Sequence, residues 1–229
     1  SAVACLMDGI YTRKPGDSPL AFVRPGEQSN ITPGPTGLAL AALCEFRNAT
    51  GREEVDGLIE RLANFLVLMQ REDGGFYLRY NSAQNRPVAV EAATNRRWNE
   101  SCRAALGLAL AHRELENPGY MLAVGRALER LTGEGSLEPK GMPRPGTAWL
   151  AAAVRESWSA LPREQHREWL NERARRAAKA QIKPESRYGA DLAGGCSAVF
   201  PPPVAATARQ VEVLAAAAAV QDSKNGNNM

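Results

Sequence analysis

Histidine and cysteine are scarce in this 229-residue sequence, which contains two histidines and four cysteines. Neither His112 nor His166 belongs to an H-E-x-x-H sequence, and no two cysteines form a C-x-x-C pair. Zinc sites of the common kinds need such spacings, so we expect no metal and no cofactor. We expect the cysteines to be buried structural thiols. They are Cys5, Cys44, Cys102 and Cys196.

Long apolar runs and a strong charge of one sign are also missing. The most apolar stretch, 211–220, is interrupted by Glu212 and is shorter than the roughly 18 to 20 residues that a membrane helix needs, so we expect no membrane span. Basic and acidic residues are interspersed and nearly balanced, 28 against 25, which disfavours nucleic acid as a partner. The G-x-S-x-G, P-loop and dinucleotide-binding sequences do not occur, which disfavours acyl-transfer, nucleotide and nicotinamide chemistry.

The sequence starts with Ser1 and has no initiator methionine. It also lacks the basic segment and long apolar stretch of a secretory signal at this end. We therefore expect a soluble chain that was processed, trimmed or cut from a longer protein. The compartment is left open between the cytoplasm and, for an excised domain, the periplasm or the outside of the cell.

What the sequence does contain is one helical segment after another. Apolar residues recur at intervals of three and four, in segments of ordinary helix length that glycines and prolines separate, which predicts an all-α fold. A partial helix over 2–10 is followed by a long connector over 11–35. Further helices are expected over 37–50, 53–70, 99–115, 120–131, 147–161, 164–180 and 204–220.

Alternate helices differ in composition. Those that start near 37, 99, 147 and 204 are rich in alanine and glycine, whose small side chains let helices pack closely around a central axis. Their partners carry more charge, as an outer layer of helices should. Gly51 fits the left-handed residue that ends many helices. We expect one continuous domain over 1–221, followed by a flexible polar tail over 222–229.

The segment 70–76, Q-R-E-D-G-G-F, ends the helix over 53–70 abruptly and sends an aromatic loop back over the helices. Together with the alternation of inner and outer helices, this Q-x-x-D-G-G-aromatic turn resembles the α/α-toroid proteins, the architecture of six-hairpin glycosidases, sugar epimerases and terpenoid cyclases. The resemblance covers 37–220. Because fewer helices are expected than six hairpins need, it implies a toroid, a partial toroid or a small (α/α)4-like barrel of repeated helical hairpins.

Missing motifs narrow this resemblance. The D-x-D-D and D-D-x-x-D segments of terpenoid cyclases do not occur, and Cys196 has no Cys-His neighbour that would complete the zinc site of a lanthionine cyclase. The carbohydrate-active branch is left, and it implies an enzyme that hydrolyses, eliminates or epimerises a glycan.

Residues for binding a sugar are sought in the loops between helices, because the resemblance implies a site at the mouth of the inner ring. Sugar rings need flat aromatic side chains against their apolar faces and polar groups around their rims. The candidates are Tyr77, Arg79, Tyr80, Trp98 and Tyr188. Arg79 ranks first among the arginines that would bind a uronate or another anion, before Arg96 and Arg97.

Acid–base chemistry on a glycan needs two carboxyl groups across a groove, about 5 Å apart for retention of configuration and roughly 6.5 to 9.5 Å for inversion. The catalytic candidates are Glu91, Glu100 and Asp191. Glu100 is also favoured by the helix dipole alone, since it lies at the start of a helix. Asp73 is expected to stabilise its own turn through backbone hydrogen bonds.

Two classes of function remain open. One is an enzyme domain acting on an oligosaccharide or polysaccharide. The other is a non-catalytic helical domain that binds a glycan or the remainder of a larger protein. Paired acids in the groove would favour the enzyme, and a groove without them would favour the binding domain.

Overall fold

The structure of the chain is a computed structural model that describes residues 10–12, 19–23, 31–90, 94–133, 145–179 and 213–220. The chain divides into two compact units, Ser1–Pro139 and Lys140–Met229, and each is described by itself. The single domain over 1–221 therefore stays a prediction. The expected tail over 222–229 lies outside the described residues, as does the expected helix over 2–10 apart from Ile10, which is in a strand.

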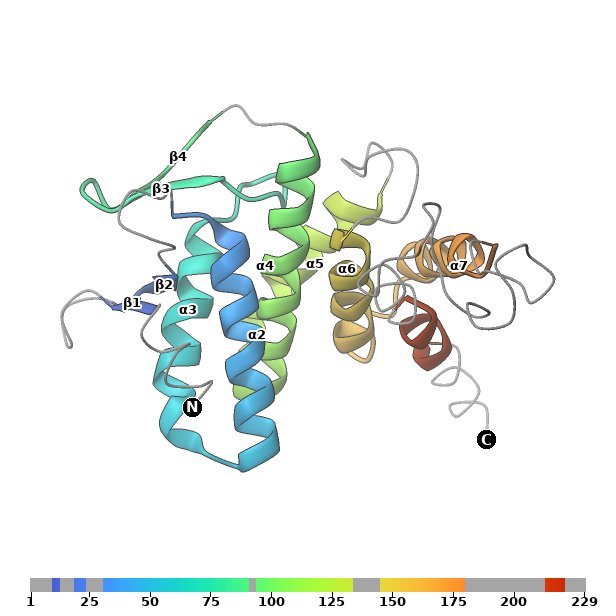
Figure 1. The fold of residues 1–229 in the computed structure, drawn as a ribbon, viewed down its shortest axis with the longest axis horizontal. Coiled ribbons are helices and arrows are strands. Elements are labelled where there is room, and N and C mark those ends of the chain that lie inside the picture. The colour runs from blue at the N-terminus through green and yellow to red at the C-terminus, as the bar shows by residue number, and fades with distance from the viewer. Residues whose placement is uncertain are drawn as a thin grey trace, which may run out of the picture. The chain divides into compact units, whose positions relative to one another are not determined.

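The first unit contains two helical hairpins (Figure 1). In the first, α2 (Pro33–Thr50) is followed by the short helix η1 (Glu53–Val55) and by α3 (Asp56–Leu68). In the second, α4 (Thr94–Leu115) is followed by α5 (Pro118–Thr132). The prediction of an all-α fold built from helical hairpins is confirmed.

Short antiparallel strand pairs accompany these helices. The strand β1 (Ile10–Thr12) pairs with β2 (Ala21–Val23), and β3 (Arg79–Asn81) pairs with β4 (Arg86–Val88). Each strand is only three residues long, which agrees with the absence of a sustained period-two pattern in the sequence.

Two helices start four or five residues before the expected position. The helix α2 begins at Pro33 rather than Gly37, because a proline suits the first helical position and Thr32 before it is extended. The helix α4 begins at Thr94 rather than Asn99. The end of α2 is as predicted, since Gly51 is left-handed (φ 67°) and its N–H donates to the carbonyl of Arg47 at 2.8 Å.

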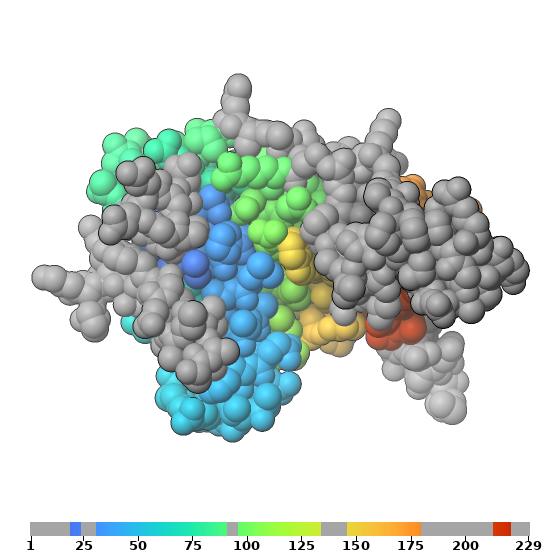
Figure 2. All heavy atoms as spheres, viewed as in Figure 1, coloured from blue at the N-terminus to red at the C-terminus, as the bar shows by residue number. Residues whose placement is uncertain are grey.

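The helices α2 and α4 pack against each other through their backbones. A Cβ atom at Gly37 would lie 2.4 Å from the carbonyl oxygen of Arg103, and one at Gly107 would lie 2.6 Å from the carbonyl oxygen of Gly37. Both distances are too short for any side chain. The small residues of the predicted inner helices therefore let these helices touch directly, and Figure 2 shows the blue atoms of α2 lying against the green atoms of α4.

Outer helices cover this pair with apolar side chains. The helix α3 buries Leu58, Ile59, Leu62, Phe65 and Leu66 along one stripe, as its sequence predicts. The helix α5 buries a stripe of its own, and the hydroxyl of Tyr120 on it donates to Oδ1 of Asn64 on α3 at 3.1 Å.

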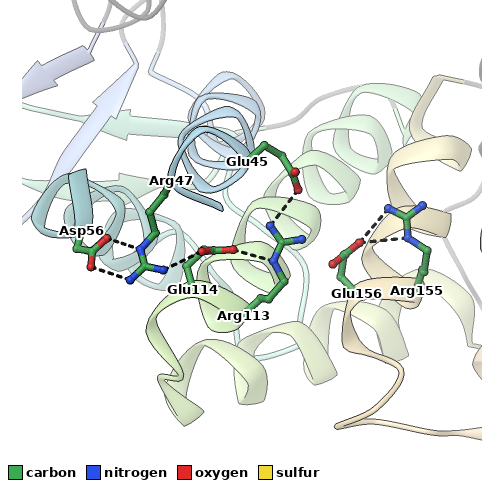
Figure 3. A network of polar contacts seen from close by, with 7 residues as sticks. All are labelled: Glu45, Arg47, Asp56, Arg113, Glu114, Arg155 and Glu156. Carbon is green, nitrogen blue, oxygen red and sulfur yellow. Dashed lines mark hydrogen bonds and ion pairs between the residues drawn. The ribbon is translucent and has the colours of Figure 1, made fainter. Parts of the chain in front are cut away.

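A charged network joins the helix ends (Figure 3), which lie far from the β3–β4 hairpin in Figure 1. Arg47, near the end of α2, donates to both carboxylate oxygens of Asp56 at the start of α3, at 2.7 and 3.2 Å. It also donates to Glu114 at the end of α4, at 3.1 Å. The side chain of Glu114 is only 5% exposed and is paired with Arg113 as well, so two arginines compensate its charge in place of water.

Two inner-helix cysteines are buried thiols that form no disulfide, as expected. Cys44 on α2 and Cys102 on α4 are both 0% exposed. Burial, helped by the nearby carboxylate of Glu114, raises the pKa of the Cys44 thiol to about 12. The other two cysteines, Cys5 and Cys196, lie outside the described residues.

The second unit contains the helices α6 (Pro145–Ser157) and α7 (Glu164–Lys179), which follow each other in the sequence through a short connector. On α6, Arg155 and Glu156 form an ion pair at 2.9 Å, which Figure 3 also draws. Burial, together with the charge of Arg163, lowers the pKa of His166 on α7 to about 4, so this imidazole is neutral at pH 7. Of the helix expected over 204–220, the structure describes 213–220, which is helical.

A glycine-to-alanine substitution inside the contact between α2 and α4 and one outside it are expected to change stability in opposite directions. Gly107→Ala is expected to lower the free energy of unfolding by about 1–3 kcal/mol, because the new methyl group pushes against backbone atoms that cannot rotate away. Gly57→Ala on α3 meets no atom within 4 Å and is expected to raise stability by up to about 1 kcal/mol through helix propensity. Urea unfolding of both variants measures this difference, and changes of the same sign would contradict the account of the interface.

Candidate functional site

The turn after α3 is attached to the second hairpin. Gly74 is left-handed (φ 80°), and a Cβ atom on it would lie 2.1 Å from the carbonyl oxygen of Arg126 on α5. Nε2 of Gln70 donates to the carbonyl of Ala123, also on α5, at 2.8 Å, and its Oε1 accepts from Arg126 at 2.9 Å. The Q-x-x-D-G-G sequence thus fixes the end of one outer helix on the backbone of the next.

Asp73 stabilises this turn, as expected. Its Oδ1 accepts the N–H of Gly75 at 3.1 Å, two residues later. Its Oδ2 lies 3.1 Å from Nη2 of Arg71. The carboxylate is therefore engaged within its own turn.

Beyond the turn, the chain forms one wall of a cleft of about 340 Å³. Tyr77 is half-buried there, and its N–H donates to the carbonyl of Met69 at 2.9 Å. The guanidinium of Arg71 lies 6.0 Å from the centre of the Tyr77 ring, and Nη2 of Arg97, near the start of α4, donates to the carbonyl of Val90 at 3.1 Å. The cleft is lined by Arg71, Phe76, Tyr77, Leu78, Ala89, Val90 and Arg97.

Tyr80 and Arg79 do not line this cleft. Tyr80 is only 4% exposed, its ring lies 5.2 Å from that of Phe65 and 5.6 Å from that of Phe22, and its hydroxyl donates to Oδ1 of Asn85 at 2.5 Å. Arg79 is exposed on the neighbouring position of β3. Since successive strand residues point to opposite faces, burial of Tyr80 in the core turns Arg79 outward.

Glu100 and Trp98 are also buried. Oε2 of Glu100 accepts the N–H of Gly34 at 2.7 Å, so this carboxylate on α4 caps the first turn of α2. Its Oε1 lies 3.9 Å from Nη1 of Arg103. Trp98 is 0% exposed. Glu100 thus stabilises the start of α2 and not that of its own helix, because α4 begins six residues earlier, at Thr94.

Three sequence candidates lie outside the described residues: Glu91, Tyr188 and Asp191. Of the candidates that the structure describes, it brings Tyr77 to the cleft and places Arg79, Tyr80, Trp98 and Glu100 elsewhere. Arg97, ranked below Arg79 from the sequence, lines the cleft, and Arg96 is exposed beside it. From the sequence, Arg71 is only a part of the turn; the signal that could have found it is its position shortly before the two glycines and two aromatic residues at 74–77.

Within the described parts of the chain, no three histidine, cysteine, aspartate or glutamate side chains are placed to hold a metal ion together. Among the described helices, none is long and apolar enough to cross a membrane.

Comparison with solved structures places the fold. The chain is similar to the Lin0763 protein from Listeria innocua, with a TM-score of 0.60 and 13% identity over 89% of this chain and 60% of that one. It is equally similar to the glycoside hydrolase family 76 (mannosidase) protein Bt3792 from Bacteroides thetaiotaomicron VPI-5482, with a TM-score of 0.60 and 17% identity over 90% of this chain and 60% of that one. No family model and no curated protein matches the sequence.

These similarities show the fold, the glycosidase-like α/α toroid that the turn and the helix alternation predicted. The chain spans about 60% of the length of either solved structure. Six complete hairpins are not established for it.

The capping role of Glu100 predicts a graded loss of stability. Glu100→Ala is expected to lower the free energy of unfolding by about 1–3 kcal/mol, because it leaves the buried N–H of Gly34 without an acceptor. Glu100→Gln keeps an oxygen acceptor and is expected to cost only about 0.3–1 kcal/mol, the value of the charge at a helix start.

Urea unfolding measures both changes, with Glu72→Ala, an exposed glutamate of the turn, as the control. The control is expected to stay within about 0.5 kcal/mol of the unsubstituted chain. A Glu100→Ala variant as stable as that control would show that the carboxylate does not hold the start of α2.

Proposed function

We propose that this chain is a carbohydrate-binding α/α-toroid domain whose ligand lies in the cleft beside Tyr77. One observation carries the proposal: a half-buried tyrosine ring and two guanidinium groups line one cleft of about 340 Å³. That volume is within the usual range for small-molecule sites, roughly 300–1,000 Å³. The ring offers a flat apolar surface to one face of a sugar, and the guanidinium groups donate hydrogen bonds to the oxygens on its rim.

The fold supports a ligand of this class. The chain is similar to a solved structure that carries the name mannosidase, and the cleft lies beside a loop between helices, where the sequence resemblance implies a site. At 17% identity this similarity is evidence for the fold alone, so the proposal that the ligand is a sugar rests on the cleft and its residues.

Binding is better supported than turnover. Among the described residues that line the cleft there is no aspartate or glutamate, whereas glycan chemistry of the usual kind needs two. The carboxylate of Glu100 is occupied by the start of α2.

The second candidate function is hydrolysis, elimination or epimerisation of the bound glycan. It is favoured by the position of Glu91 in the sequence, directly after the cleft residue Val90. Turnover assays of the chain and of Glu91→Gln test this form. Product formation that Glu91→Gln abolishes would establish an enzyme, and no turnover of any glycan that binds would leave a binding domain.

The binding proposal is tested by thermal shift and calorimetry against neutral and uronate oligosaccharides. Tyr77→Ala is expected to weaken binding about tenfold, because it removes the stacking surface, and Tyr77→Phe is expected to bind like the unsubstituted chain, because it keeps the ring. Equal binding by Tyr77→Ala, or no binding of any oligosaccharide to the unsubstituted chain, would contradict the proposal.

A further inference from the structure

The cleft beside Tyr77 carries positive charge. Two of its lining residues are arginines, Arg71 from the turn after α3 and Arg97 from α4, and the described lining contains no acidic residue. A neutral sugar needs no such charge, since hydroxyls are bound as well by amides and backbone groups. The charge therefore bears on which sugars the cleft selects.

Arg97 is the more specific of the two cations. Its side chain is partly buried, and Nη2 donates to the carbonyl of Val90, which holds the guanidinium in the wall of the cleft. A guanidinium has five N–H donors. Among the described residues, no carboxylate lies within ion-pair distance of Arg97, so its charge is not compensated there by the part of the protein that the structure describes.

Arg71 is available for a ligand in a different way. It is paired with Asp73, but both side chains are about two-fifths exposed, at 41% and 40%, and exposed ion pairs of this kind are worth at most about 1 kcal/mol. Its guanidinium already lies over the Tyr77 ring, at 6.0 Å from the ring centre. A ligand on that ring would therefore be within reach of a second cation.

We propose that the cleft selects sugars that carry a carboxylate, that is, uronate residues, with Arg97 as the main determinant and Arg71 as a second one. The proposal rests on the proposed function, because it assigns a class of sugar to the same cleft. The planar fork of a guanidinium matches the two oxygens of a carboxylate and forms paired, charge-assisted hydrogen bonds with it. The Tyr77 ring then stacks on the apolar face of the same sugar residue.

The experiment compares each acid with its own neutral form. Trisaccharides of galacturonate, glucuronate and mannuronate are titrated into the full 229-residue chain by calorimetry, each as the free acid and as the full methyl ester, which keeps the sugar shape and removes the charge. Neutral mannose and glucose trisaccharides complete the panel. We expect at least one free acid to bind at least about tenfold tighter than its ester, which is the effect of one charge-assisted pair.

Two neighbouring arginines on α4 provide a matched pair of variants. Arg97→Gln is expected to reduce the preference for the acid over the ester to less than about threefold, because the fork and its charge are gone. Arg97→Lys keeps the charge without the planar fork, so its preference for the acid is expected to lie between that of Arg97→Gln and that of the unsubstituted chain. Arg96→Gln removes the same charge from an exposed position outside the cleft lining and is expected to keep the full preference. Melting curves of all variants check that they are folded.

The outcomes separate this inference from the proposed function. If esters or neutral trisaccharides bind as tightly as the acids, the preference for uronates is wrong and the glycan-binding cleft stands. If nothing in the panel binds, both fail. If the acids are preferred but Arg97→Gln keeps that preference, or Arg96→Gln loses it, the assignment to the cleft is overturned.

Discussion

The direct backbone contact between α2 and α4 is the constraint on which the first unit depends. Because Gly37 and Gly107 leave no room for a side chain between the two helices, their backbones meet at one fixed place. The N–H of Gly34 and the carboxylate of Glu100 fix the alignment of the helices at their starts, and Arg47 and Glu114 fix it at their ends. Both inner helices therefore run in the same direction, as successive inner helices of hairpin repeats must.

This alignment positions the cleft. The outer helix α3 packs on both α2 and α4, and the turn that follows it rests on α5 through Gln70 and Gly74. The chain that leaves this turn carries Tyr77 to the cleft, and α4, held against α2, carries Arg97 to the same cleft. The site is thus made from the end of an outer helix and the start of an inner one, two segments that the hairpin repeat brings together. The Q-x-x-D-G-G turn therefore has a structural role, attaching α3 to α5, and also contributes Arg71 to the cleft.

Local patterns in the sequence predicted what depends on local interactions. Helical periodicity predicted the hairpins, and the glycine at position 51 predicted the end of α2, since glycine readily adopts the left-handed conformation observed there. Contacts between distant segments were not predictable in the same way. Tyr80 was expected in a groove, but Phe22 and Phe65 bury its ring, and strand alternation then turns Arg79 away from the cleft. Glu100 caps a helix that begins far away in the sequence, and the Pro-Gly-Pro start of that helix looked like a connector.

The most direct test of the account is amide hydrogen exchange of the chain, with and without an excess of the trisaccharide that it binds best among neutral sugars and uronates. If the ligand occupies the cleft beside Tyr77, exchange slows in residues 76–78 and 88–90, while 31–36, at the Glu100-capped start of α2, are unchanged. Slower exchange around 31–36 and 98–101 with no change over 76–90 would place the site at the start of the inner helices and contradict the account, as would no change anywhere.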